Sequence, residues 1–285
     1  MFKQYEIFIS VHDQDLILQL EKNNIFRNIS DYKYLFLGSR PIDKLSDIRD
    51  KVVIARDLPD NIEHDKCLFD YTGWYALVKN NLIRGSHVVI VHYDCLLYKN
   101  FEKEITKVFK KNPDYFINFQ PHLLTCDYFI PDIYAKTAIK GLKDVFDIDI
   151  QTYIDNAINN GDKYWPGGGS FACSKEWLES YVDWIEKIHS ILITDPMAAH
   201  NIERTMKFYN LVFGVKEKYL PHVMKHIFNA AHNQTYQKKQ TQEVKQKEFQ
   251  AFIDGNLFNC FAETKGCRDY IKLIKYTIEQ LLLKF

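Results

Sequence analysis

The chain has 285 residues, of which 46% are hydrophobic, so it can bury a sizeable core as one large domain or as one domain with an appendage. It carries 37 basic and 37 acidic residues. This zero formal charge argues against a general nucleic-acid binder, and we expect no nucleic-acid partner. Glycine and proline are scarce, at 11 and 8 residues, which argues against a disordered or loop-rich protein.

Cysteine usage and the first residues indicate the compartment. The six cysteines show no CxxC spacing and are typical of reduced thiols in the core of a cytosolic protein. The opening sequence MFKQYEIFISVHDQD is too charged for a signal peptide, and no apolar run approaches the length of a membrane span. We therefore expect a cytoplasmic protein.

The first part of the chain alternates strand and helix patterns. Short strands separated by helical or loop segments favour parallel crossovers in an α/β fold. A helix is predicted over Phe69–Ile83, where apolar residues recur every three or four positions, and Gly85 is predicted to close it. The elements predicted before this helix are a strand over Tyr5–Val11 that ends at His12, a helix over residues 15–23, and strands over Tyr34–Leu37 and Val52–Ala55.

The stretch Val88–Leu97, VVIVHYDCLL, organises the rest of the chain. Its first four residues are apolar and mostly β-branched, which predicts a strand buried on both faces in the middle of a parallel sheet. His92 and Asp94 follow at its carboxyl end, where open α/β folds bind ligands. In an extended chain, side chains two residues apart point the same way, so this pair could hold a divalent cation. A hydrogen-bonded strand terminus is the alternative.

Helix and strand patterns continue through the second half of the chain. Residues 120–165 are predicted to be an insertion that helps to wall a cleft. The elements predicted here are helices over Phe101–Lys111, Ile133–Phe146, Ile150–Asn159, Lys175–Leu192 and Met197–Phe213, and strands over Tyr115–Phe119 and Ser170–Cys173.

The sequence Trp165-Pro166-Gly167-Gly168-Gly169 is the glycine cluster of the chain. Three glycines let the backbone come close to a ligand, although a tight turn before a strand explains them equally well.

After Thr235 the composition changes, and apolar spacing predicts an amphipathic terminal helix over residues 271–285. We therefore divide the chain into a main domain, 1–235, and a helical extension, 236–285. The extension carries a small positive surplus, which gives weak support to peripheral contact with an anionic membrane.

Four features, taken in order, carry a resemblance to a known family. They are the opening strand YEIFISVH; the aromatic helix ending in Lys79-Asn80; VVIVHYDCLL, where the family has an apolar strand, Asp-x-Asp and an apolar pair; and the late series WPGGGSFACSKEWLESYVDWI, HNIERTMKFY and HIFNAAHNQTY. Over roughly residues 5–235 the chain resembles GT-A-fold glycosyltransferases, and more narrowly the bacterial enzymes that build capsule, lipooligosaccharide or O-antigen.

The resemblance implies a mostly parallel, Rossmann-like α/β sheet flanked by helices. It also implies transfer of a sugar from a nucleotide-sugar donor, with a UDP-sugar favoured, to a glycan or glycolipid acceptor. The enzyme would work in the cytoplasm or at the inner face of the cytoplasmic membrane, and a homo-oligomer is compatible with the sequence.

The motif departs from the family pattern, because His92 stands where the family has its first Asp. Asp94 keeps the position of the second acid, which in the family usually binds the metal. The resemblance implies a divalent cation held by His92, Asp94 and either His226 or His232, with His232 slightly favoured. Imidazole suits Mn²⁺ better than Mg²⁺, which prefers oxygen, so Mn²⁺ is favoured. The same departure is compatible with a metal-independent enzyme.

The resemblance also assigns roles around this motif. Asp94 and Glu203 are the catalytic candidates, with Glu203 as the base of an inverting reaction or, alternatively, as the surface partner of Arg204. The donor-binding candidates are His12, Gly38, Ser39, Arg40, Asp70, Lys79, His92 and Tyr93. The acceptor-binding candidates are Trp165, Gly167, Gly168 and Gly169, and Trp165 is either a stacking surface for a sugar or a structural residue.

Other classes of function stay open on the sequence. A metal-dependent nucleotidyltransferase or phosphotransferase could use the same sheet edge, although the chain lacks a P-loop pattern. A non-catalytic nucleotide- or sugar-binding protein with a degenerate site draws support from His92. A structural partner recruited to a membrane assembly by residues 236–285 is a third alternative.

Overall fold

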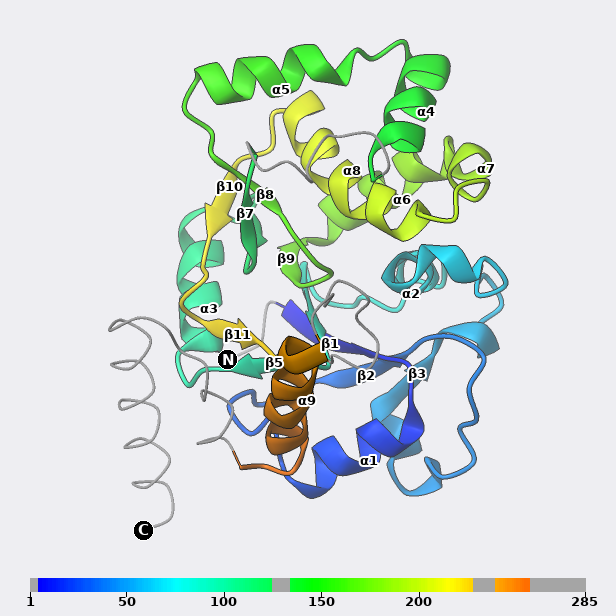
Figure 1. Cartoon of the computed structure of the whole chain (residues 1–285), viewed down its shortest axis with the longest axis vertical. Helices are drawn as coiled ribbons and strands as arrows, with labels where there is room; N and C mark the ends of the chain where they lie inside the picture. The colour runs from blue at the N-terminus through cyan, green and yellow to red at the C-terminus, as the bar shows by residue number, and fades with distance from the viewer. Residues whose placement is uncertain (1–4, 125–133, 228–238, 257–285) are drawn as a thin grey trace.

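The computed structural model describes residues 5–124, 134–227 and 239–256 (Figure 1). The predicted terminal helix over 271–285 and the candidate ligand His232 lie outside the described residues.

A seven-stranded sheet in the order β10-β6-β9-β4-β1-β2-β3 runs through the molecule. Strand β9 is antiparallel to both of its neighbours, and the other neighbouring pairs are parallel. The predicted α/β class with a mostly parallel sheet is confirmed. The strands of this sheet are β1 (Tyr5–Val11), β2 (Lys33–Phe36), β3 (Val52–Ile54), β4 (His87–His92), β6 (Phe116–Asn118), β9 (Phe171–Ser174) and β10 (Glu217–Tyr219).

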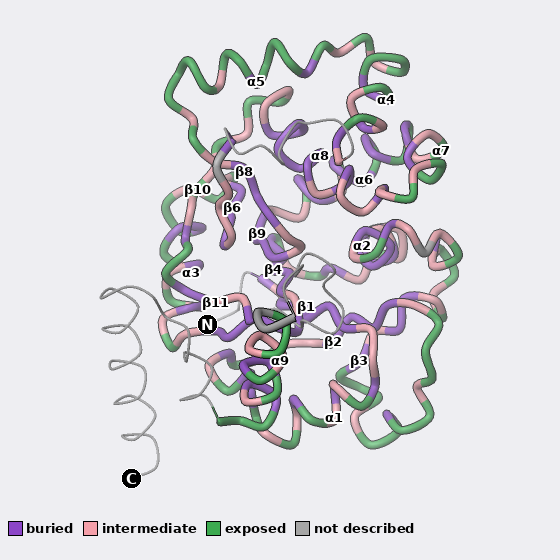
Figure 2. Tube along the Cα trace, in the orientation of Figure 1, coloured by how far each residue is buried: buried purple, intermediate pink, exposed green. Residues whose placement is uncertain are grey.

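Helices cover both faces of this sheet, and its strands are mostly buried apart from the edge strand β10 (Figure 2). One hydrophobic core lies under α1, α3 and α9, and the other lies under α2, α6 and α8, with α4 and α5 beyond them. The helices are α1 (Gln14–Lys22), α2 (Asp70–Lys79), α3 (Phe101–Lys111), α4 (Lys136–Phe146), α5 (Ile150–Asn159), α6 (Lys175–Glu186), α7 (His189–Leu192), α8 (Ala198–Val212) and α9 (Lys239–Ile253).

Strand β4 lies at the centre of the sheet because it is apolar on both faces. Val89 and Val91 belong to one core, while Val88 and Ile90 belong to the other. Side chains of successive residues point to opposite faces of a strand, so a continuous apolar run fits only between two covered faces. This position was predicted from the sequence.

Helix α2 is shorter than predicted. It ends at Lys79 rather than near Ile83, and Gly85 does not close it. Asn81 takes the left-handed conformation instead, with φ of 53°. Its N–H donates to the Val78 carbonyl at 3.0 Å, and the Leu82 N–H donates to the Leu77 carbonyl at 3.0 Å. These two bonds form a Schellman turn, in which asparagine replaces the expected glycine.

The predicted helix over Lys175–Leu192 is two helices, α6 and α7. Its start is as predicted, because the Ser174 hydroxyl accepts a hydrogen bond from the Trp177 N–H at 3.1 Å. The break comes at Ile188, which leaves helical geometry at φ −108° and ψ 2°. Ile188 is fully buried and packs directly on Gly141 of α4. Burial of this side chain therefore overrides the continuous helical spacing.

Helix α9, the described part of the predicted extension, packs on the main body. Phe249, Phe252 and Ile253 belong to the core under β1, and the Phe249 ring lies 6.0 Å from that of Tyr93. Glu248 is 3% exposed and accepts hydrogen bonds from Lys225 and Lys245, both at 2.8 Å. Among the described helices, none has both the length and the apolarity needed to cross a membrane.

We expect Glu248→Gln to lower the free energy of unfolding by about 1–2 kcal/mol, because two charge-assisted hydrogen bonds at a buried carboxylate are weakened. Urea unfolding followed by circular dichroism measures the change. Gln250→Ala, on the exposed side of the same helix, is the control and should stay within about 0.5 kcal/mol of the wild type. Equal stability of both variants would contradict the role of Glu248 in docking α9.

Candidate metal and donor site

The candidate site lies in a turn at the carboxyl end of β4. Strand β4 ends at His92, and residues Tyr93 and Asp94 form a turn before β5 (Cys95–Leu97). The chain is therefore not extended between His92 and Asp94, contrary to the reasoning from alternating side chains. The turn nevertheless brings the pair together, with His92 Nδ1 2.9 Å from Asp94 Oδ1.

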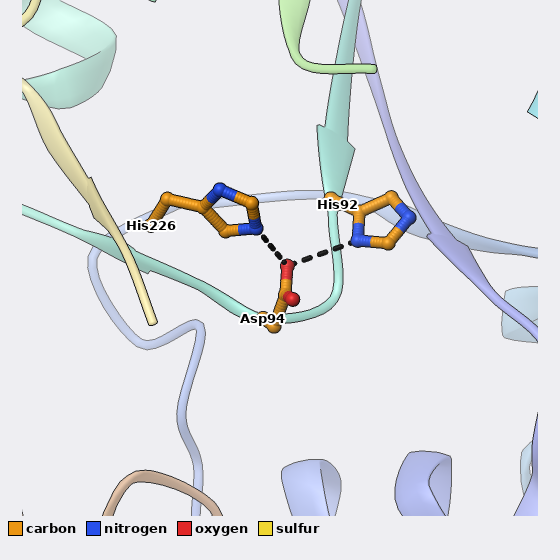
Figure 3. Close-up of side chains that lie close together, drawn as sticks. All are labelled: His92, Asp94 and His226. Atoms are coloured by element: carbon orange, nitrogen blue, oxygen red, sulfur yellow. Dashed lines mark hydrogen bonds and ion pairs between the residues drawn. The ribbon is translucent and has the colours of Figure 1, made fainter. Parts of the chain in front are cut away.

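A second small sheet brings His226 to the same carboxylate. Strand β11 (Met224–His226) pairs antiparallel with β5, and His226 lies opposite Cys95. His226 Nε2 is 3.0 Å from the same oxygen, Asp94 Oδ1, so both rings point at one carboxylate (Figure 3). The Ile227 N–H donates to the Asp94 carbonyl at 2.7 Å and holds the end of β11 against the turn. Of the two histidines that the sequence left open, the structure brings His226 to Asp94.

The donor set of these three residues fits a divalent cation. The two imidazole nitrogens and the carboxylate oxygen lie within 4.8 Å of one another. In octahedral coordination at about 2.1 Å, neighbouring ligand atoms are about 3 Å apart. The separations of 2.9 and 3.0 Å between each nitrogen and Asp94 Oδ1 match that spacing. Two imidazoles and one carboxylate suit Mn²⁺ or a similar transition metal better than Mg²⁺.

Electrostatic interactions within the cluster favour the charged forms of Asp94 and His92. Asp94 is 4% exposed, and burial opposes ionisation, but His226 and His92 outweigh burial and hold the pKa of Asp94 well below its usual range. Burial likewise opposes protonation of His92, yet Asp70 and Asp94 raise the pKa of its ring well above the usual range. A divalent cation would therefore compete with a proton for the His92 nitrogen.

Asp70, at the start of α2, orients the His92 ring. Its Oδ2 lies 3.4 Å from His92 Nε2, so one ring nitrogen faces Asp70 and the other faces Asp94. A carboxylate on the far nitrogen of a metal-binding histidine sets the tautomer and the orientation of the ring. Asp70 therefore supports the candidate metal site, although the sequence placed it among the donor-binding residues.

The glycine cluster lies against this site. A Cβ at Gly169 would sit 2.6 Å from Asp70 Oδ2, and one at Gly167 would sit 1.9 Å from the His122 ring. Gly168 has φ of 77°, which side chains disfavour. The cluster is thus required for close backbone approach to neighbouring side chains. The next residue, Ser170, accepts a hydrogen bond from the His92 N–H at 3.0 Å; no sequence signal pointed to it.

Four of the residues predicted to meet the nucleotide follow the ends of β1 and β2, namely His12, Gly38, Ser39 and Arg40. The His12 ring lies 5.2 Å from that of Tyr93, which stands between the candidate metal ligands His92 and Asp94 in the chain. Ser39 and Arg40 are exposed, and Arg40 pairs with Asp13, the N-cap of α1.

Gly38 has φ of 81° and donates its N–H to Glu63. Glu63 is a residue of this region that the sequence did not indicate, because a lone acid in a loop carries no pattern.

Two donor-binding candidates, Lys79 and Tyr93, do not present their side chains to the site. Lys79 is the last residue of α2, about 13 Å along the helix from Asp70. It pairs there with Asp183 at 2.9 Å and Glu186 at 2.8 Å on α6. Tyr93 is 1% exposed, so its ring packs in the core rather than presenting a face to the donor. The structure therefore does not bring these two side chains to the surface of the site.

Trp165 is 2% exposed, so its ring lies in the interior, as the structural alternative expects. The Arg204 guanidinium lies 4.8 Å from its ring centroid, and the His122 ring lies 5.4 Å away. Arg204 also donates to Glu203 at 3.1 Å, so the ion pair that the sequence offered as an alternative is present. Trp165 (in β8, Tyr164–Pro166) therefore packs against Arg204, which in turn holds Glu203.

His122, in β7 (Pro121–Leu123), lies against Gly167 of the glycine cluster and was missed by the sequence. Burial lowers the pKa of His122, His226 and Arg204 lower it further, and Glu203 opposes them. The charges of both Glu203 and His226 therefore act on the His122 ring. A single histidine in a loop-like segment gives no sequence signal, so only the fold could find it.

Comparisons with known proteins address the fold. No protein-family model matches the sequence, and no curated protein matches it. Among solved structures, the chain is similar to the apo structure of WbbM, a bifunctional glycosyltransferase, with a TM-score of 0.52 and 16% identity over 82% of this chain and 48% of WbbM. The chain therefore spans about half the length of WbbM.

A second solved structure, S. aureus TarS 1–349, matches at 12% identity over 90% of this chain and 82% of that one. Its TM-score of 0.29 is too low to carry an argument. At 16% identity the likeness to WbbM concerns the fold alone. The chain thus has a GT-A-like glycosyltransferase fold, with a mostly parallel seven-stranded sheet flanked by helices.

Proposed function

We propose that the protein is a glycosyltransferase that moves a sugar from a nucleotide-sugar donor, a UDP-sugar in the favoured case, to a glycan or glycolipid acceptor. The observation that carries the proposal is the convergence of His92 and His226 on Asp94, within a GT-A-like fold and at the carboxyl end of its central strand. Ligands of open α/β sheets bind at this edge.

The proposed reaction breaks the bond between the anomeric carbon and the diphosphate. Negative charge grows on the leaving diphosphate, and a divalent cation at this site, Mn²⁺ in the favoured case, would stabilise it. His92, Asp94 and His226 would hold the cation, and Asp70 would keep the His92 ring oriented. The turn that contains Gly38 and Arg40 would contact the nucleotide.

On the acceptor side, the glycine cluster provides close backbone approach beside Asp70 and His122. Glu203 would accept the proton of the acceptor hydroxyl if the reaction inverts the anomeric centre. Its pair with the buried Arg204, at 3.1 Å, holds the carboxylate in place. A surface polysaccharide or lipooligosaccharide chain is the proposed acceptor, and the cytoplasm is the proposed location.

Thermal melting of the purified protein tests this proposal. The protein is melted with UDP and a panel of UDP-sugars, each with Mn²⁺ and with EDTA, because a ligand that binds only the folded state raises the melting temperature. A rise that requires Mn²⁺, followed by transfer or slow hydrolysis of the same UDP-sugar, is the expected result. A rise that persists in EDTA would remove the metal role, and no rise with any member of the panel would contradict the glycosyltransferase assignment.

A further inference from the structure

Phe69 combines an exposed aromatic ring with a backbone conformation that disfavours side chains. It is 69% exposed, which makes it the most exposed large apolar side chain among the described residues. Its backbone has φ of 44° and ψ of −122°, a region that glycine adopts readily and other residues avoid. Neither burial of the ring nor backbone preference explains a phenylalanine here.

Hydrogen bonds hold this conformation in place. The Phe69 carbonyl accepts from the Thr72 N–H at 3.1 Å and from the Thr72 hydroxyl at 2.8 Å. The Thr72 hydroxyl also lies within hydrogen-bond reach of Glu63, which accepts the N–H of Gly38. The strained residue is thus tied to the turn proposed to contact the nucleotide. Strain of this kind persists where the surrounding structure determines it, and it often marks functional positions.

The position of Phe69 borders the candidate acceptor side. The next residue, Asp70, lies 3.4 Å from His92 and packs against Gly169 of the glycine cluster. The exposed ring of Phe69 therefore belongs to the residue that directly precedes Asp70 in the chain. One face of a pyranose ring presents C–H groups, which pack on the face of an aromatic ring.

We propose that Phe69 stacks on the terminal pyranose ring of the acceptor, which makes it an acceptor-binding residue. This inference rests on the proposed glycosyl transfer. The ring would contribute contact area to a bound sugar without a charge or hydrogen bond, and the fixed backbone would limit the entropy lost when the sugar binds.

Phe69→Gly is the informative variant, because glycine removes the ring and also adopts the backbone conformation without strain. Its melting temperature should be no lower than that of the wild type. Binding of methyl glycosides of glucose, galactose, N-acetylglucosamine and N-acetylgalactosamine is measured by saturation-transfer NMR in the presence of UDP and Mn²⁺. For the glycoside that binds the wild type, we expect Phe69→Gly to lower the binding affinity by roughly tenfold. Phe69→Trp should bind the same glycoside with the wild-type affinity.

UDP binding provides the second readout. Phe69→Gly should leave the UDP-dependent melting shift unchanged, because the ring is assigned to the acceptor. Three results would each overturn the inference. Phe69→Gly could bind the glycosides as the wild type does, it could lose only UDP binding, or the wild type could bind UDP and none of the glycosides. Failure of the proposed function has a different signature, since the wild type would then show no shift with UDP or any UDP-sugar.

Phe213→Ala is the matched control for removal of an exposed phenylalanine. Phe213 is 55% exposed at the end of α8, and its ring lies 4.5 Å from that of Tyr209 and 6.1 Å from that of Trp184. Glycoside binding by Phe213→Ala should equal that of the wild type, and a matching loss in both variants would show that exposed phenylalanines act only through general stability.

Discussion

Asp94→Ala is expected to lower the rate of sugar transfer by roughly 10³-fold and to abolish the Mn²⁺-dependent rise in melting temperature with UDP. The physical reason is the convergence of both imidazoles on Asp94 Oδ1, at 2.9 and 3.0 Å. Without this carboxylate the site keeps two nitrogen donors and loses its negative ligand. UDP release measures the rate, and isothermal titration with Mn²⁺ measures the affinity.

Two further variants separate this effect from a loss of folding. Asp94→Asn keeps the shape of the side chain and should still lose most of the Mn²⁺ affinity, because a neutral amide is a weaker ligand. Asp183→Asn removes an exposed carboxylate that pairs with Lys79 at the far end of α2, and it should leave the rate unchanged. If Asp94→Ala keeps the Mn²⁺-dependent shift, the proposed metal site is wrong.

His226→Ala is expected to weaken Mn²⁺ binding by more than about 100-fold, whereas His232→Ala should keep the wild-type affinity. Removing a residue that only supports a metal ligand already costs about 10- to 100-fold, and the loss of a ligand should exceed that. The pairing of β11 with β5 places His226 Nε2 beside Asp94, which makes it the ligand that this fold supports.

His222→Ala completes the comparison, because His222 is an exposed histidine on the segment that leads into β11. Its affinity for Mn²⁺ should match that of the wild type. The opposite pattern, with loss in His232→Ala and retention in His226→Ala, would restore the preference drawn from the sequence. Equal and large losses in both would assign both histidines to the site.

The elements of the fold were largely predictable because their signals are local. The two-sided apolar run of Val88–Val91 placed β4 at the centre of the sheet, and helix α3 has the predicted bounds Phe101–Lys111. The ends of α2 and α6 were less predictable. Asn81 can terminate a helix in place of glycine, and burial of Ile188 against Gly141 breaks a spacing that continues through it.

Half of the candidate site was also visible in the sequence, since His92 and Asp94 are neighbours at a strand end. Their contact did not arise for the predicted reason, because Tyr93 and Asp94 form a turn rather than a continued strand. Trp165 and Lys79 are opposite cases, in which the sequence suggested a binding residue and the fold uses the side chain elsewhere. Each belongs to a residue type that often binds sugars or phosphates, yet one is buried under Arg204 and the other pairs with α6.

The sequence by itself determined the α/β class, the central strand and the pair of potential ligands that follows it, because hydrophobic periodicity and short spacings are properties of neighbouring residues. Only the tertiary structure decided that His226 completes the group, that Asp70 orients His92, and that the His122 ring packs against Gly167. These contacts join segments far apart in the chain through strand pairing and glycine packing, and no local pattern encodes which distant segment will meet a given turn.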